Sequence, residues 1–106
     1  MIIVSFQTKK LRILCEDSQV AATQLGDNVA RLLRARLADL RSADGLFDLP
    51  TGNPRVEGGH YLLDLGRAAT MRWVPYGRSV NPTDTSTLDW KGVNRVKLVG
   101  IDRGTQ

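Results

Sequence analysis

The sequence predicts an α+β domain in which a pair of helices packs on one face of a single sheet. Apolar residues recur at helical spacing between residues 9 and 44. Short alternating stretches, rich in β-branched and aromatic residues, occupy 1–6, 60–66, 69–76 and 95–101. The order of strand, two helices and three strands is typical of the α+β class. We therefore expect an N-terminal strand, an antiparallel two-helix hairpin and a three-strand antiparallel meander.

Length and composition are those of one globular domain covering residues 1–106. Fifteen Lys and Arg against eleven Asp and Glu give a net charge of +4, which indicates either a solvated surface or a polyanionic partner. Cys15 is the only cysteine, which excludes an internal disulfide and fits a reducing compartment. The N-terminal apolar stretch is too short for a signal peptide, so we expect a cytoplasmic protein with no membrane partner.

The first two elements follow from the N-terminal third of the chain. Met1 to Phe6 is expected to form a buried strand. Thr8 is a suitable N-cap for a helix that starts at Lys9 and ends before Gly26. Its apolar face would comprise Leu11, Leu14, Cys15, Ala22 and Leu25.

The second helix is expected over residues 29–44, with Asp27 or Asn28 as its cap and Gly45 at its close. Its buried face would hold Val29, Leu33, Leu37 and Leu40, and Arg31, Arg34 and Arg41 would form an exposed stripe. Arg36 projects on the apolar side. Either it extends outward from the edge of the stripe, or a carboxylate such as that of Asp64 holds it inside.

The second half of the chain is predicted to be loop and sheet. Residues 46–59 are interrupted by Pro, Gly and Asn and are expected to form a loop. Two strands then meet at a turn around Gly66 and Arg67. A long polar loop over 77–92 precedes a final strand from Arg95 to Ile101, whose exposed face is basic.

The candidate chemistry needs cations and a proton carrier. His60 is the only histidine, and neither a cluster with metal-ligand spacing, a nucleophile elbow nor a Walker loop is present, so we expect no metal and no cofactor. RNA is cleaved when its own 2′-hydroxyl attacks the adjacent phosphate, which cations and proton transfer accelerate. The residues that fit these roles are Arg55, Arg72, His60 and Tyr76. Each also has a purely structural interpretation, on the surface or at the core rim.

Several segments in order resemble one family. These are VSFQTKKLRILCED, ARLLRARLADLRSAD, LPTGNPRVEGG, LDLG, TLDW and VNRVKLVGI. Together they resemble the RelE/ParE superfamily of bacterial toxins, in particular the HigB-like (plasmid maintenance killer) group. The resemblance implies a microbial-ribonuclease-like fold and a metal-independent mRNA endonuclease acting on the ribosome. It also implies a cognate helix-turn-helix antitoxin, through which alone the toxin would contact DNA.

The resemblance also assigns residues. Arg72 matches the arginine usual on the middle strand, and Asp102 retains an acidic position after the last strand. Arg55 stands where the family has histidine and Glu57 where it has lysine. No tyrosine or histidine follows Asp102, where members carry an Asp-Tyr-His-like tail. The chain is therefore expected to be an active toxin, a catalytically impaired relative that binds only antitoxin or RNA, or a gyrase poison of the ParE type.

Charge alone predicts a broader RNA-facing surface. The basic face of the last strand and the basic residues of the helices are the candidates for phosphate contacts. We expect the RNA-binding residues to be Lys9, Arg12, Arg34, Arg95 and Lys97.

Overall fold

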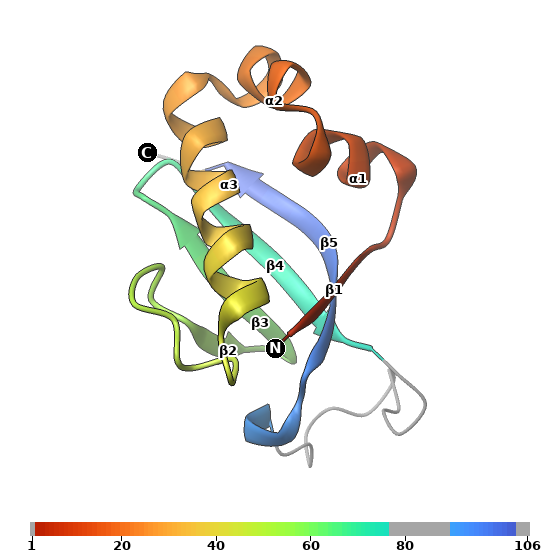
Figure 1. Cartoon of the computed structure of the whole chain (residues 1–106), viewed down its shortest axis with the longest axis vertical. Coiled ribbons are helices and arrows are strands. Elements are labelled where there is room, and N and C mark those ends of the chain that lie inside the picture. The colour runs from red at the N-terminus through yellow and green to blue at the C-terminus, as the bar shows by residue number, and fades with distance from the viewer. Residues whose placement is uncertain (1, 77–89, 104–106) are drawn as a thin grey trace.

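A computed structural model describes residues 2–76 and 90–103 as a five-stranded mixed sheet with three helices (Figure 1). The α+β class is confirmed. Helix α3 crosses one face of the sheet, and α1 and α2 lie over the same face toward the end of β5 (Figure 1). The elements are β1 (Ile3–Phe6), α1 (Lys9–Glu16), α2 (Ser18–Leu25), α3 (Asp27–Ser42), β2 (Arg55–Glu57), β3 (His60–Leu65), β4 (Ala69–Pro75), a short 3₁₀ turn (Trp90–Gly92) and β5 (Arg95–Arg103).

The sheet has the strand order β1-β5-β4-β3-β2. Strands β3, β4 and β5 form the expected antiparallel meander, and β1 adds to it parallel to β5, with Ile3 opposite Arg95. The N-terminal strand was expected to be buried, and that prediction is wrong. Ile3 is exposed because it lies opposite Arg95, on the sheet face away from the helices; within β1 the residues are at most partly buried, and Ile2 just before it is fully buried.

The expected first helix is divided into two at Asp17, so the helical layer has three helices instead of a two-helix hairpin. Thr8 caps α1 as predicted, accepting from the Leu11 amide. The Asp17 backbone is extended, and its carboxylate accepts from the amides of Gln19 and Val20. Because the Asp17 carboxylate bonds these amides in place of the carbonyls of the preceding turn, the first helix ends there and a new one begins.

The ends of the later elements also differ from expectation. Helix α3 starts directly after Gly26 without a side-chain cap and ends at Ser42, with Ala43 as its C-cap. The predicted loop 46–59 contains strand β2, which pairs with β3. Strand β5 extends to Arg103. Of the predicted loop over 77–92, residues 90–92 form the 3₁₀ turn; residues 77–89 and 104–106 lie outside the described residues.

The core lies between α3 and the sheet and follows the predicted periodicities. Val29, Leu33, Leu37 and Leu40 are buried from α3, and every second residue of β3 and β4 is buried against them. The hydroxyl of the buried Tyr61, near the start of β3, donates to the carbonyl of Leu46. Burial raises the pKa of Tyr61.

Arg36 is neither extended into solvent nor held by the Asp64 carboxylate. Its side chain is 11% exposed, and its Nε donates to the main-chain carbonyl of Asp64 at 3.1 Å. Its Nη1 lies 3.6 Å from the carboxylate of Asp39, one turn further along α3. The main-chain carbonyl of Asp64 and the carboxylate of Asp39 therefore take the place of the Asp64 carboxylate. Among the helices that the structure describes, none is long and apolar enough to span a membrane.

Candidate nucleic-acid interface

The sheet face opposite the helices carries most of the predicted site residues. Alternation along β3, β4 and β5 turns one residue in two toward the core, and the others lie on this second face. Strand register places them in rows across the sheet. We call this surface the open sheet face; it comprises Ile3, Ser5, Arg55, Glu57, His60, Leu62, Asp64, Thr70, Arg72, Val74, Tyr76, Arg95, Lys97, Gly100 and Asp102.

Arg72 lies at the middle of this face and is paired with Asp102. Its Nε lies 3.1 Å from Asp102 Oδ2, and its Nη2 lies 3.4 Å from Oδ1. The two side chains are 37% and 60% exposed. Gly100 is opposite Arg72 on β5, next to a register shift in the β4–β5 pairing. The predicted cation and the predicted acid are thus brought together.

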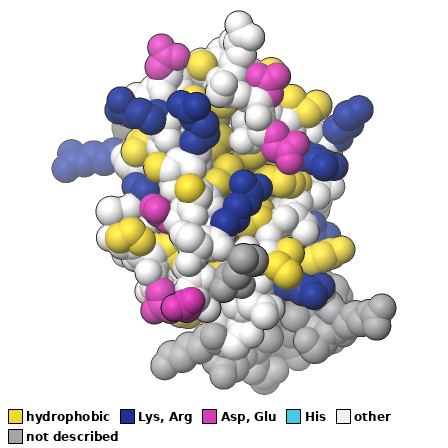
Figure 2. All heavy atoms as spheres, in the orientation of Figure 1, with side chains coloured by type: hydrophobic (Ala, Val, Ile, Leu, Met, Phe, Trp, Pro, Cys, Tyr) yellow, Lys and Arg dark blue, Asp and Glu magenta, His cyan; other side chains and the backbone are white. Residues whose placement is uncertain are grey.

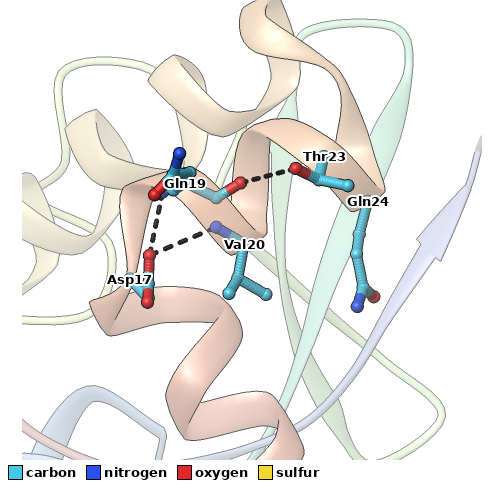
Figure 3. A pocket seen from close by; sticks show the side chains of 5 residues that line it. All are labelled: Asp17, Gln19, Val20, Thr23 and Gln24. Atoms are coloured by element: carbon cyan, nitrogen blue, oxygen red, sulfur yellow. Dashed lines mark hydrogen bonds between the residues drawn. The ribbon is translucent and has the colours of Figure 1, made fainter.

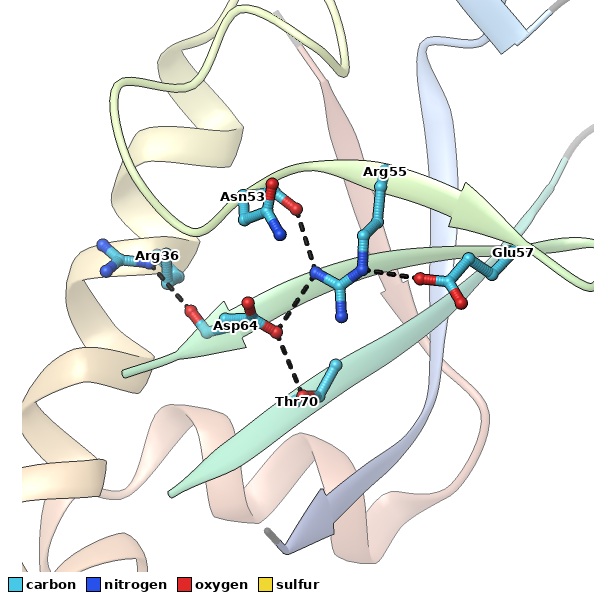
Figure 4. Close-up of polar contacts among 6 residues, drawn as sticks. All are labelled: Arg36, Asn53, Arg55, Glu57, Asp64 and Thr70. Carbon is cyan, nitrogen blue, oxygen red and sulfur yellow. Dashed lines mark hydrogen bonds and ion pairs between the residues drawn. The ribbon is translucent and has the colours of Figure 1, made fainter. Parts of the chain in front are cut away.

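Arg55, the predicted second cation, is enclosed by acceptors (Figure 4). Its Nε donates to Glu57 at 2.8 Å, and its Nη1 donates to the Asp64 carboxylate at 3.2 Å and the Asn53 carbonyl at 3.0 Å. Hydrogen bonding to Glu57, and then to Asp64, raises the pKa of Arg55. Thr70 donates to the same Asp64 oxygen at 3.1 Å. Two carboxylates around one guanidinium leave this part of the face without net positive charge.

The other end of the open sheet face combines cations with an aromatic ring. The Lys97 ammonium lies 5.0 Å from the centre of the Tyr76 ring, a cation–π distance. Tyr76 is 45% exposed, and its amide donates to the carbonyl of Arg95. His60 is half-buried at the start of β3, on the same face. Within the described residues neither Lys97 nor Arg95 forms an ion pair with a carboxylate.

The remaining predicted RNA contacts lie on the helices, apart from this face. Lys9 and Arg12 are exposed on α1, where Arg12 lies 3.4 Å from the Glu16 carboxylate. Arg34 is exposed on α3, on the opposite side of the sheet from Lys97. On the helical side, basic and acidic side chains are interspersed with apolar ones (Figure 2). The five predicted residues therefore do not form one surface, and only Arg95 and Lys97 belong to the open sheet face.

A depression on the helical side has two of its polar side chains, Asp17 and Thr23, engaged in hydrogen bonds within α2. It is an open depression of about 380 Å³ along α2, lined by Asp17, Gln19, Val20, Thr23 and Gln24 (Figure 3). Asp17 caps the helix, and the Thr23 hydroxyl donates to the carbonyl of Gln19 at 2.9 Å.

Within the part of the chain that the structure describes, no three His, Cys, Asp or Glu side chains are grouped as metal ligands.

Sequence reasoning missed the residues that surround the two arginines. The contacts of Arg55 with Asp64 and Asn53, and that of Thr70 with Asp64, were not predicted; the Arg55–Asp64 contact requires β2 to pair with β3. Gly100 was also missed. A lone glycine inside an alternating strand is a known sign of a bulge or a close approach, and that signal was present in the sequence.

The open sheet face has the donors that bind phosphate and the groups that move protons. A guanidinium, an ammonium, an imidazole and a phenol are distributed along one exposed surface. No protein-family model, curated protein or solved structure matches the chain.

Proposed function

We propose that this chain is the toxin of a type II toxin–antitoxin pair, a metal-independent endoribonuclease that cleaves mRNA at the ribosome. The observation that carries the proposal is the common location of Arg72, His60, Tyr76, Arg95 and Lys97 on one exposed sheet face. A surface of cations next to an exposed aromatic ring suits single-stranded RNA, because phosphates pair with the cations and bases stack on the ring.

The proposed reaction uses the RNA's own nucleophile. The 2′-hydroxyl attacks the adjacent phosphorus, a 2′-O–P bond forms, and the P–O5′ bond breaks, leaving a 2′,3′-cyclic phosphate and a 5′-hydroxyl. Arg72 stabilises the negative charge that develops on the phosphorane oxygens. His60 or Tyr76 takes the 2′-hydroxyl proton, and the same group or a water molecule donates a proton to the leaving 5′ oxygen, which restores the starting state.

Activity is expected to be weak, because only Arg72 of the two arginines assigned to catalysis keeps a free pair of donors. Arg55 is occupied by Glu57 and Asp64, and the aromatic and imidazole groups of the family's tail are missing. Each acid–base group typically contributes a factor of about 10²–10⁴, so the loss of two reduces the rate strongly.

The pairing of Arg55 favours a second candidate function. In that alternative the chain is a catalytically impaired toxin that retains only binding to its antitoxin or to RNA. The two candidates differ in whether any cleavage occurs. Both keep the helix-turn-helix antitoxin as the expected partner.

The test is to induce the wild type, Arg72→Ala and His60→Ala in cells and to map mRNA ends. Arg34→Ala is the matched control, since it removes an exposed arginine from the helical side. Codon-specific ends that disappear with Arg72→Ala and persist with Arg34→Ala support the endonuclease. Cleavage that survives Arg72→Ala contradicts the assignment of the site. Absence of cleavage by the wild type, with antitoxin binding intact, favours the impaired toxin.

A further inference from the structure

The Arg72 guanidinium is held along one of its two double-donor edges. The side-on edge, formed by Nε and Nη2, lies against the Asp102 carboxylate at 3.1 and 3.4 Å. The end-on edge is formed by Nη1 and the second N–H of Nη2. No acceptor for Nη1 is found among the described residues. The side chain as a whole is 37% exposed, and it lies on the open sheet face.

Gly100 provides the space in which the guanidinium lies. A Cβ atom on Gly100 would be 2.6 Å from Arg72 Nη2 and 3.4 Å from Cζ. Gly100 is not one of the glycines with positive φ, so its backbone suits any residue. The lack of a side chain at Gly100 leaves the space that the Arg72 guanidinium occupies. An alanine there would displace the guanidinium from β5.

Arg55, on the same face, differs from Arg72 because donors on both of its edges are already hydrogen-bonded. Its Nε is taken by Glu57, and its Nη1 is taken by Asp64 and Asn53. Each double-donor edge therefore has one donor engaged, and no free pair remains. Arg72 keeps a complete pair, which is the arrangement that binds two oxygens of one phosphate group.

We propose that Gly100 and Asp102 are positioning residues that hold Arg72 flat on β5, so that its end-on edge binds one phosphodiester group of RNA through two N–H···O bonds. The identity of the ligand as RNA rests on the proposed function. The positioning itself is a property of the free protein. The alternative is that Asp102 competes with phosphate for Arg72. If Asp102 positions Arg72, neutralising Asp102 weakens RNA binding; if it competes, neutralising it strengthens RNA binding.

The decisive variants are Gly100→Ala, which leaves the charge unchanged, and Asp102→Asn. Their matched controls are Gly92→Ala, where an added Cβ has no neighbour within 4 Å, and Asp44→Asn, an exposed acid remote from the face. All four are made in the wild type and in Arg72→Ala. Affinity for a short single-stranded RNA is measured by fluorescence anisotropy, and the Arg72 Nε–Hε resonance is followed by NMR during titration with inorganic phosphate.

Gly100→Ala is expected to weaken RNA binding roughly tenfold, the usual weight of a charge-assisted hydrogen bond, and to have no effect in the Arg72→Ala background. Phosphate should shift the Arg72 resonance in the wild type and in Gly92→Ala, but not in Gly100→Ala. Equal losses with and without Arg72 would overturn the proposal, as would Asp102→Asn binding RNA more tightly than Asp44→Asn. A wild-type resonance that does not respond to phosphate also overturns it. If phosphate shifts the resonance but no RNA binds, the RNA function fails and the positioning stands.

Discussion

Arg36 donates from Nε to the main-chain carbonyl of Asp64 and thereby joins α3 to β3 (Figure 4). The register of β2 with β3 ends at Leu62, so the backbone of Asp64 lies beyond the last paired residue of that edge. The Asp64 amide donates to the Gly52 carbonyl at 2.7 Å, and the Asp64 carbonyl accepts from Arg36. Both backbone groups of Asp64 are therefore satisfied by the loop and the helix, while its carboxylate serves Arg55 on the open sheet face.

Arg36→Ala is expected to lower the free energy of unfolding by about 1.5–3 kcal/mol, because it removes a charged donor from a partly buried carbonyl. The measurement is urea unfolding followed by circular dichroism. Arg34→Ala is the control, since Arg34 is exposed on the same helix. An Arg36→Ala variant with wild-type stability would show that water replaces the guanidinium without loss.

Gly52→Ala is expected to destabilise the protein for two separate reasons. Gly52 has φ +93°, which costs an L-residue about 1–2 kcal/mol. Its Cβ would also lie 2.9 Å from Cδ and Nε of Arg36. The second cost should vanish in the Arg36→Ala background and the first should stay, so the two effects can be separated by a double-mutant cycle in urea. Gly92→Ala, with open space around it, should be nearly neutral; full additivity in the cycle would contradict the contact.

Cys15 is expected to be an unreactive thiol in the folded protein. Burial raises its pKa from 9.0 to about 12, with Arg41 opposing the shift and Glu16 adding to it. The thiolate is therefore scarce at neutral pH, and reaction with a disulfide reagent should be much slower than in the urea-unfolded chain. The same shift favours folding below pH 9 and loses its effect as pH rises toward 12, since the unfolded thiol ionises first. Equal reaction rates in the two states would contradict this.

RNA binding is expected to weaken steeply with salt through the cations of the open sheet face. Removing one phosphate contact lowers the slope of log affinity against log salt by about 0.7 for a single strand. Lys97→Gln and Arg95→Gln should each show this reduction. Arg34→Gln, which removes the same charge from the helical side, should leave the slope unchanged. Equal reductions in all three variants would mean that net charge, rather than this face, determines binding.

Much of the candidate site follows from strand alternation in the sequence. Arg72, Val74 and Tyr76 share a face of one strand, and Arg95 and Lys97 share a face of another, so their exposure was predictable residue by residue. Arg34 was predicted to bind RNA together with them because its positive charge alone does not indicate on which side of the sheet it lies. The helix that carries it covers the opposite side of the sheet (Figure 1).

The sequence by itself determined the α+β class, the core faces of α3, β3 and β4, and the Thr8 cap, because these depend on periodicity and on contacts within a few residues. Only the tertiary structure decided which carboxylates pair with Arg72 and Arg55. Asp102 follows Arg72 by 30 residues and Asp64 follows Arg55 by nine, and each pair meets through the pairing of separate strands. The meander that makes β4 and β5 neighbours was predicted, but a local pattern did not give their register, and it did not reveal β2 or its pairing with β3.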